Sequence, residues 1–206
     1  RVYGSVGIDG LQGPTETVVL ADESADPVFC AAELLAQAEH DVLASAIMIT
    51  TSSDLALRVS REVERQLKEL ERREIISQSL EGRGGIVVVD NINEAIDLVN
   101  EYAPEHLSLM VEDAPSYIDR IHNAGGIFIG CPEALGDYIA GPSHVMPTGG
   151  TARFSSPVGI EDFQKVISVV NLDKESIERL GPPAATIADC EGLTAHARAM
   201  RMRLDQ

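Results

Sequence analysis

Short apolar runs alternate with amphipathic segments along the first two thirds of the chain. Five of these runs predict buried strands, at residues 17–21, 44–50, 85–90, 106–111 and 126–130. Strands that are apolar throughout and are separated by helices are typical of a parallel sheet with helices on both faces. The pattern therefore predicts the α/β class.

Helices are predicted between the strands by their caps and apolar stripes. The longest begins at Ser53 and carries apolar residues at steps of three and four: Leu55, Val59, Val63, Leu67 and Leu70. These steps match one face of a helix. Asp26 and Pro27 are favourable first residues for an earlier helix that runs to about His40. Two further helices are expected at residues 93–102 and 114–123.

The pattern changes after residue 130. Residues 141–156 are rich in Gly, Pro, Ser and Thr, which predicts a long loop. An apolar run at 165–172 predicts another strand, and two helices are expected at 174–180 and 190–205, separated by the Gly-Pro-Pro of residues 181–183. This tail is too short for a core of its own, so we expect it to dock on another surface.

The composition excludes several classes of function. Of 206 residues, 44% are hydrophobic and 24% are charged, which fits a globular chain rather than a disordered one. The 33 acidic and 16 basic residues give a net charge of −17, which disfavours binding to nucleic acid or to anionic membranes. No apolar stretch is long enough to span a bilayer. The chain begins without Met and without a signal-like segment, so we expect a fragment or a processed product.

The cysteines indicate the compartment. Cys30, Cys131 and Cys190 are odd in number and far apart, and no two form a CxxC pair. This pattern does not predict a disulfide scaffold and fits a reducing, cytosol-like compartment. The simplest interpretation of all three is that they are small buried apolar residues.

Two pairs of residues near the ends of predicted elements are candidates for chemistry. Gln37 and His40 lie three apart on one helix and share a face, so they could present an oxygen and an imidazole to a metal, although a structural histidine at a helix end is as plausible. Glu105 and His106 follow Pro104 at a helix-to-strand junction and could divide general acid and base roles. Adjacent residues in an extended segment point to opposite faces, so both reach one site only if the chain bends there.

Weaker candidates lie further along the chain. Asp137 precedes the Gly-rich loop and suits a metal or an amine, or else caps a helix. Glu191 and His196 are five apart, a poor spacing for one helical face. Gly149-Gly150 could bind an anion or form a flexible turn, and no P-loop, HExxH or GxSxG motif is present.

Taken together, these segments resemble the histidinol dehydrogenase family. The resemblance runs in order along the whole chain through residues 7–16, 21–27, 34–40 and 102–107, then 136–156 with the sequence GDYIAGPSHVMPTGGTARFSS, and finally 191–196. It implies a zinc-dependent, NAD-linked enzyme that oxidises L-histidinol through L-histidinaldehyde to L-histidine, the final step of histidine biosynthesis, in the cytoplasm.

The resemblance also assigns roles to single residues. The four residues that look like zinc ligands are Gln37, His40, Asp137 and His196, and the acid–base pair is Glu105 with His106. The residues that look like substrate contacts are Thr15, Gln37, His40, His106, Asp137, Glu191 and His196. No position is assigned to NAD, because this chain lacks the N-terminal part of the family pattern that supplies those contacts.

The missing part shapes the expected fold. The resemblance implies an incomplete Rossmann-like sheet in a domain spanning residues 1–157, followed by a helical segment at 158–206 that reaches a partner subunit in a homodimer. Glu191 and His196 would then complete a site across the interface. Two alternatives stay open, an inactive zinc-binding and dimerisation fragment and a zinc hydrolase.

Overall fold

A five-stranded parallel sheet is the centre of the structure, a computed structural model that describes residue 2 and residues 4–204. The order of the strands is β3-β2-β1-β4-β5, and each neighbouring pair is parallel. The strands are β1 (Glu16–Ala21), β2 (Ser45–Thr50), β3 (Gly85–Val88), β4 (His106–Met110) and β5 (Gly126–Ile129). The predicted parallel α/β sheet is confirmed.

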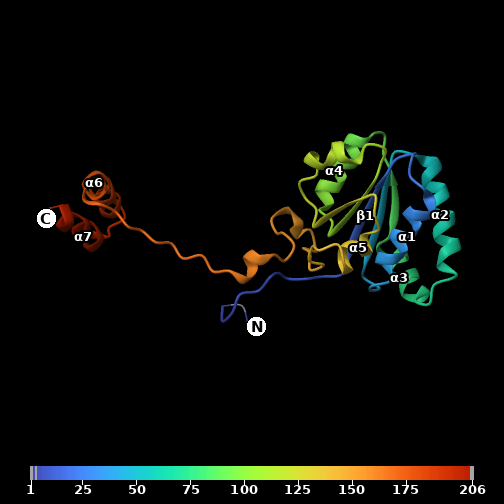
Figure 1. The fold of residues 1–206 in the computed structure, drawn as a ribbon, viewed down its shortest axis with the longest axis horizontal. Coiled ribbons are helices and arrows are strands. Elements are labelled where there is room, and N and C mark those ends of the chain that lie inside the picture. The colour runs from blue at the N-terminus through green and yellow to red at the C-terminus, as the bar shows by residue number, and fades with distance from the viewer. Residues whose placement is uncertain (1, 3, 205–206) are drawn as a thin grey trace. The chain divides into compact units, whose positions relative to one another are not determined.

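Helices cover both faces of this sheet (Figure 1). The helices of this part are α1 (Pro27–Ala38), α2 (Ser53–Leu67), α3 (Arg73–Arg83), α4 (Ile92–Tyr102) and α5 (Glu133–Tyr138). Three 3₁₀ segments lie outside these helices, η1 (Ala114–Arg120) between β4 and β5, and η2 (Thr151–Arg153) and η3 (Ile160–Phe163) after α5. The sequence predicted neither α3 nor α5, and the helix expected at 114–123 is the shorter 3₁₀ segment η1.

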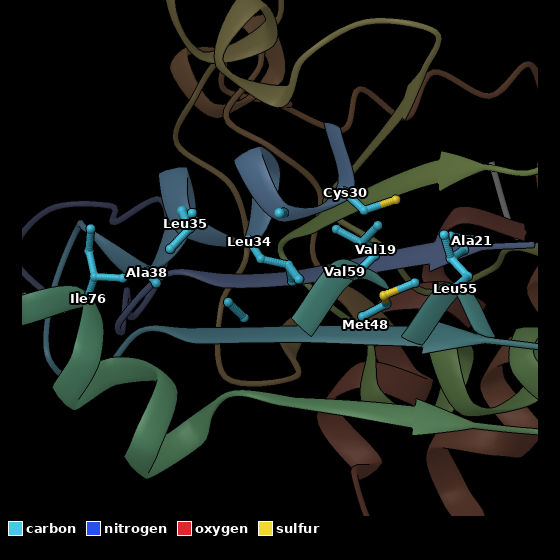
Figure 2. Packing of buried hydrophobic residues seen from close by; sticks show 12 residues of the cluster. Val19, Ala21, Cys30, Leu34, Leu35, Ala38, Met48, Leu55, Val59 and Ile76 are labelled. Atoms are coloured by element: carbon cyan, nitrogen blue, oxygen red, sulfur yellow. The ribbon is translucent and has the colours of Figure 1, made fainter. Parts of the chain in front are cut away.

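Alternation along β1 divides the apolar residues between two cores. Val19 and Ala21 face α1, α2 and α3, whereas Val18 and Leu20 belong to the core with α4. Figure 2 shows the first of these cores, where Leu34 of α1 and Met48 of β2 lie beside Val19. Successive side chains of a strand point to opposite faces, so a strand that is apolar throughout needs both layers of helices.

The loop predicted at 141–156 is confirmed as irregular apart from η2. It is held firmly at its centre, where Met146 and Thr148 are buried. The Thr148 hydroxyl accepts a hydrogen bond of 2.6 Å from the backbone N–H of Gly13, ahead of β1. The loop therefore packs beside the residues that lead into the central strand.

The chain divides into two compact units after Gln164. The second unit contains α6 (Lys174–Cys190) and α7 (Thr194–Leu204), which pack through Ala185, Ala188 and Ala197. The sequence placed the domain boundary after residue 157, seven positions earlier than this division.

Two expectations for the second unit are wrong. Residues 165–172 form no strand, and Val166, Ile167, Val169 and Val170 are exposed. A strand needs a hydrogen-bonded neighbour, and the described residues offer none there. The helix expected to stop before residues 181–183 instead continues through them as α6, because the following turn is held by Ala185 and Ala188 against α7.

Within the residues that the structure describes, no helix has the length and apolar character needed to cross a membrane.

Candidate active site

The site begins at the turn between α4 and β4. Helix α4 ends at Tyr102 and is capped by Ala103, which has a left-handed φ of 57° and lies just before Pro104. These two residues redirect the chain, since the left-handed residue closes the helix and proline cannot extend it. Glu105 and His106 follow at the start of β4, buried at 7% and 3% exposure. The bend that the sequence analysis required is therefore present.

Register places His106 in the middle of three strands. In the sheet it lies beside Thr17 of β1 and Gly126 of β5. Leu107 and Leu109 face the α4 core, so the side chains of His106 and Ser108 point to the opposite face, which α1 covers. The site thus lies on the α1 face, at the end where the strands begin.

Helices α1 and α5 bring four polar side chains to this face of the sheet. Glu33 and Gln37 are four residues apart on α1, and Glu133 and Asp137 are four apart on α5. Residues at this spacing share one face of a helix. Glu33, Gln37 and Glu133 are buried.

His106 is held between two carboxylates. Its Nε2 lies 3.0 Å from Oδ1 of Asp137, and its Nδ1 lies 3.5 Å from Oε2 of Glu105. The Phe128 ring stacks on the imidazole at a centroid distance of 5.6 Å and an interplanar angle of 20°. Burial alone lowers the pKa of His106, but Glu105, Asp137 and the charge of Glu133 raise it to about 9. In this arrangement the imidazole is fixed in orientation and favours its charged form.

Glu105 is itself held in place from β1. Its Oε2 accepts a hydrogen bond of 3.2 Å from the backbone N–H of Glu16, the first residue of that strand. Thr15, half-buried just ahead of Glu16, fixes the same segment because its carbonyl oxygen accepts a bond of 2.9 Å from the N–H of Ser45. The segment of Thr15 and Glu16 is therefore hydrogen-bonded to Ser45 of β2 on one side and to Glu105 on the other.

Glu133 is a buried carboxylate that the sequence analysis did not single out. It is 0% exposed, and its oxygens accept bonds of 2.9 and 3.0 Å from the hydroxyl of Thr17. Its Oε2 also accepts a bond of 2.9 Å from Nε2 of Gln37. Burial raises the pKa of Glu133 to about 7, against the lowering effect of His106. The sequence could have indicated Glu133 by its position four residues before Asp137, because residues at this spacing share a helix face. The spacing is informative only when α5 is recognised as a helix first.

Gln37 offers the clearest fit to a metal ion. Its Oε1 is buried and has no hydrogen-bond partner among the described residues, while its Nε2 is bound to Glu133. A buried oxygen without a partner is costly unless something binds it, and an amide oxygen can ligate a cation. Asp137 supplies a second oxygen donor on the same face of the sheet. These two residues fit a metal that accepts oxygen ligands.

In the described part of the first unit, no hydrogen bond joins the side chain of His40, also assigned to zinc, to Gln37 or Asp137. His40 is exposed in the bend after α1, where its N–H donates to the carbonyl oxygen of Gln37 at 3.3 Å. Glu191, assigned to the substrate, and His196, assigned to zinc and the substrate, belong to the second unit and are exposed there. In the described part of the chain, no three His, Cys, Asp or Glu side chains come close enough to hold a metal ion.

Two of the remaining sequence interpretations can be compared with the structure. Gly149 and Gly150 both have positive φ, and their backbone amides lower the pKa of Glu16, although burial raises it more. The amides of this turn thus interact with a carboxylate of the chain itself.

Of the cysteines, Cys30 is buried as expected, but Cys131 and Cys190 are exposed, so the interpretation of all three as buried residues is wrong.

A cavity of about 600 Å³ lies at the carboxyl ends of β1, β4 and β5. Its lining includes Asp26, Phe29, Met110 and Ile129, and it shares Glu33 and Phe128 with the surroundings of His106. Carboxyl ends of parallel strands, where the strand order reverses between β1 and β4, are the usual place for ligands in open α/β sheets.

Fold and site together define an α/β protein with a buried histidine between two carboxylates on one face of a parallel sheet. The family model of histidinol dehydrogenase matches residues 1–204, and the chain belongs to this family. It is 56% identical over 206 residues to the histidinol dehydrogenase of Dehalococcoides mccartyi, covering 99% of this chain and 47% of that protein.

Further comparisons agree with this membership. The histidinol dehydrogenase of Deinococcus radiodurans is 52% identical over 207 residues, with 98% of this chain and 47% of that protein covered. The crystal structure of histidinol dehydrogenase from Elizabethkingia anophelis superposes with a TM-score of 0.91 at 41% identity, covering 97% of this chain and 46% of that one. The chain therefore spans about half the length of the relatives it matches.

Proposed function

We propose that this chain forms the metal- and substrate-binding part of a cytoplasmic, homodimeric histidinol dehydrogenase. The reaction is the oxidation of L-histidinol through L-histidinaldehyde to L-histidine. The observation that carries the proposal is the buried His106 between Glu105 and Asp137, on the same face of the sheet as Gln37, whose Oε1 has no partner among the described residues. This arrangement offers a base and an oxygen that can bind a cation, and both can assist the oxidation of an alcohol.

His106 is the residue suited to take the alcohol proton. Oxidation of an alcohol removes a proton from oxygen and a hydride from carbon, so the site needs a base beside the hydroxyl. Asp137 lies 3.0 Å from Nε2 of His106, Glu105 lies 3.5 Å from its Nδ1, and Phe128 stacks on the ring. A cation bound to Asp137 would oppose the charged form of the ring, and a neutral imidazole fixed in this way accepts a proton without having to reorient.

Glu105 is suited to the second oxidation, in which water must add to the aldehyde. Its carboxylate is 7% exposed and is held by the backbone N–H of Glu16, so it is aimed beside His106. It removes a proton from water as the water attacks the carbonyl carbon. The hydrated aldehyde then loses a second hydride and a proton, which gives the carboxylic acid.

The bound groups supply what these side chains cannot. A zinc ion would orient and polarise the substrate. Two molecules of NAD would each accept one hydride, one in each oxidation. The proposed zinc ligands are Gln37, His40, Asp137 and His196. The proposed substrate contacts are Thr15, Gln37, His40, His106, Asp137, Glu191 and His196. Glu191 and His196 would come from the second unit of a partner subunit.

A second candidate is an inactive module that binds zinc and dimerises. It is supported by the buried Oε1 of Gln37, which has no partner among the described residues, and by the paired helices α6 and α7. The two candidates differ in one property, the reduction of NAD in the presence of L-histidinol.

The test measures zinc per chain, molar mass in solution and NADH formed per L-histidinol consumed. The proposed enzyme binds about one zinc per subunit and forms about two NADH per histidinol. The measurement is made on this chain and on the complete protein that contains it, with His122→Ala as the control because His122 lies outside the site. Zinc binding and dimerisation without NADH in both proteins would favour the inactive module. A complete protein that binds no zinc would refute both candidates.

A further inference from the structure

We propose that Glu133 is a positioning residue that fixes the side-chain amide of Gln37 with its oxygen toward the metal position. The inference rests on the proposed function, in which Gln37 is a zinc ligand. It concerns a residue that neither the family resemblance nor the sequence pattern assigned to the site.

A glutamine amide has two different ends. Its oxygen can ligate a cation, whereas its NH₂ group donates hydrogen bonds and cannot. Rotation of the amide by half a turn exchanges these ends at little steric cost. A glutamine ligand therefore needs a neighbour that distinguishes nitrogen from oxygen.

Glu133 makes this distinction at Gln37. Its Oε2 lies 2.9 Å from Nε2 of Gln37, and in the ionised form of Glu133 this oxygen accepts only from the nitrogen end. The oxygen end must then point away from Glu133, and there it is buried without a partner in the described part of the chain. In that part, Glu133 is the one side chain that hydrogen-bonds the amide of Gln37.

Glu133 can orient another residue because it is itself immobilised. The hydroxyl of Thr17 donates to both of its carboxylate oxygens, at 2.9 and 3.0 Å. Its own backbone N–H donates to Oε2 of Glu33 at 3.2 Å, which ties the first turn of α5 to α1. With 0% exposure, the carboxylate has no path to solvent, so its acceptor stays opposite Gln37.

The isosteric variant provides a matched comparison. Glu133→Gln keeps one oxygen that can face Nε2 of Gln37, whereas Glu133→Leu removes every acceptor at similar volume. Thr17→Val removes the other hydrogen bond of Glu133 and leaves its bond to Gln37. Loss of such an outer partner typically weakens a metal site by about 10–100-fold.

The experiment measures zinc affinity of the complete protein by competition with a chromogenic chelator. We expect Glu133→Leu to raise the dissociation constant at least about tenfold and Glu133→Gln to stay within about threefold of the parent. Thr17→Val should raise it by less than Glu133→Leu does, because the bond to Gln37 remains. In a Gln37→Ala background, Glu133→Leu should add less than about threefold, because the amide on which it acts is gone. An equal loss in Glu133→Gln, or a full additional loss in the Gln37→Ala background, would overturn the proposal in favour of a charge effect.

A second measurement needs no metal and no destabilising variant. In the metal-free parent protein, the Nε2 protons of Gln37 should exchange with solvent at least about tenfold more slowly than those of the exposed Gln78. Fast exchange at Gln37 would overturn the orientation by Glu133 whether or not zinc binds. Slow exchange in a protein that binds no zinc would instead refute the proposed function. The amide of Gln37 would then be oriented by Glu133 but would not serve as a zinc ligand.

Discussion

Oδ1 of Asp137 lies 3.0 Å from Nε2 of His106, so one carboxylate is shared by the proposed base and the proposed metal. A carboxylate has two oxygens, and one can hold the imidazole while the other ligates a cation. The two functions are therefore coupled through a single side chain of α5.

The first prediction follows from this contact. Asp137→Asn should lower the pKa of His106 in the metal-free protein by about one unit or more, because a neutral amide no longer favours the imidazolium. The pKa of His106 in the parent and in the variant is measured by NMR titration of the imidazole ring. Asp119→Asn, an exposed change on η1, is the control. An unaltered titration of His106 in Asp137→Asn would show that this contact is not formed in solution.

His106→Asn should separate catalysis from metal binding. We expect turnover with L-histidinol to fall about 10²–10⁴-fold, since the base is lost, while zinc content stays near that of the parent. Steady-state rates and metal analysis on the same preparation check both. Parallel loss of zinc would make His106 a ligand and contradict its assignment as the base.

Gly136 on α5 should tolerate no side chain. A Cβ there would overlap the ring of Phe128, which stacks on His106. Gly136→Ala should lower the free energy of unfolding by about 1–3 kcal/mol. Urea denaturation followed by circular dichroism provides the measurement.

The matched control for this substitution is Gly82→Ala. Gly82 is also inside a helix, α3, but a Cβ there would meet nothing within 4 Å. Alanine should leave stability unchanged or raise it by up to about 1 kcal/mol. Equal effects of the two substitutions would refute the contact with Phe128.

The stability of the metal-free protein should fall as the pH rises through the range 7 to 9. The pKa of His106 is raised from 6.5 to about 9 in the folded state, so its contribution is complete below 6.5 and disappears as the pH passes 9. The shift corresponds to about 3 kcal/mol. The raised pKa of Glu133, about 7, acts in the same direction at lower pH.

Urea denaturation at several pH values checks this dependence. In His106→Asn, the free energy of unfolding should change little between pH 7 and 9. Its dependence on pH near 7 and below should remain, because Glu133 causes that part. A parent curve that rises with pH in this range would contradict the environment described for His106.

His196→Ala should weaken zinc binding of the complete protein by at least about tenfold, as expected for a ligand. His122→Ala serves as the control. Chelator competition gives the dissociation constants. An unchanged value for His196→Ala would remove this residue from the proposed ligand set.

Local pattern determined most of the first unit. The strand at Glu16–Ala21 and the helix at Ser53–Leu67 were predicted because burial on both faces demands apolar strands and burial on one face demands a helical stripe. Helix α5 was missed because it has six residues and follows Pro132 in a Gly-rich region. The strand expected at 165–172 is absent because an apolar run forms no strand without a hydrogen-bonded partner, and the described residues offer none there.

The sequence by itself determined the class of fold and, through its motifs, the family and the candidates Gln37, Glu105, His106 and Asp137. Only the tertiary structure decided which of them meet. His106 reaches Asp137 across 31 positions of sequence, and Gln37 reaches Glu133 across 96. Such contacts depend on strand register and on how α1 and α5 lie over the sheet. No local preference encodes those relations, so the role of Glu133 became apparent only in three dimensions.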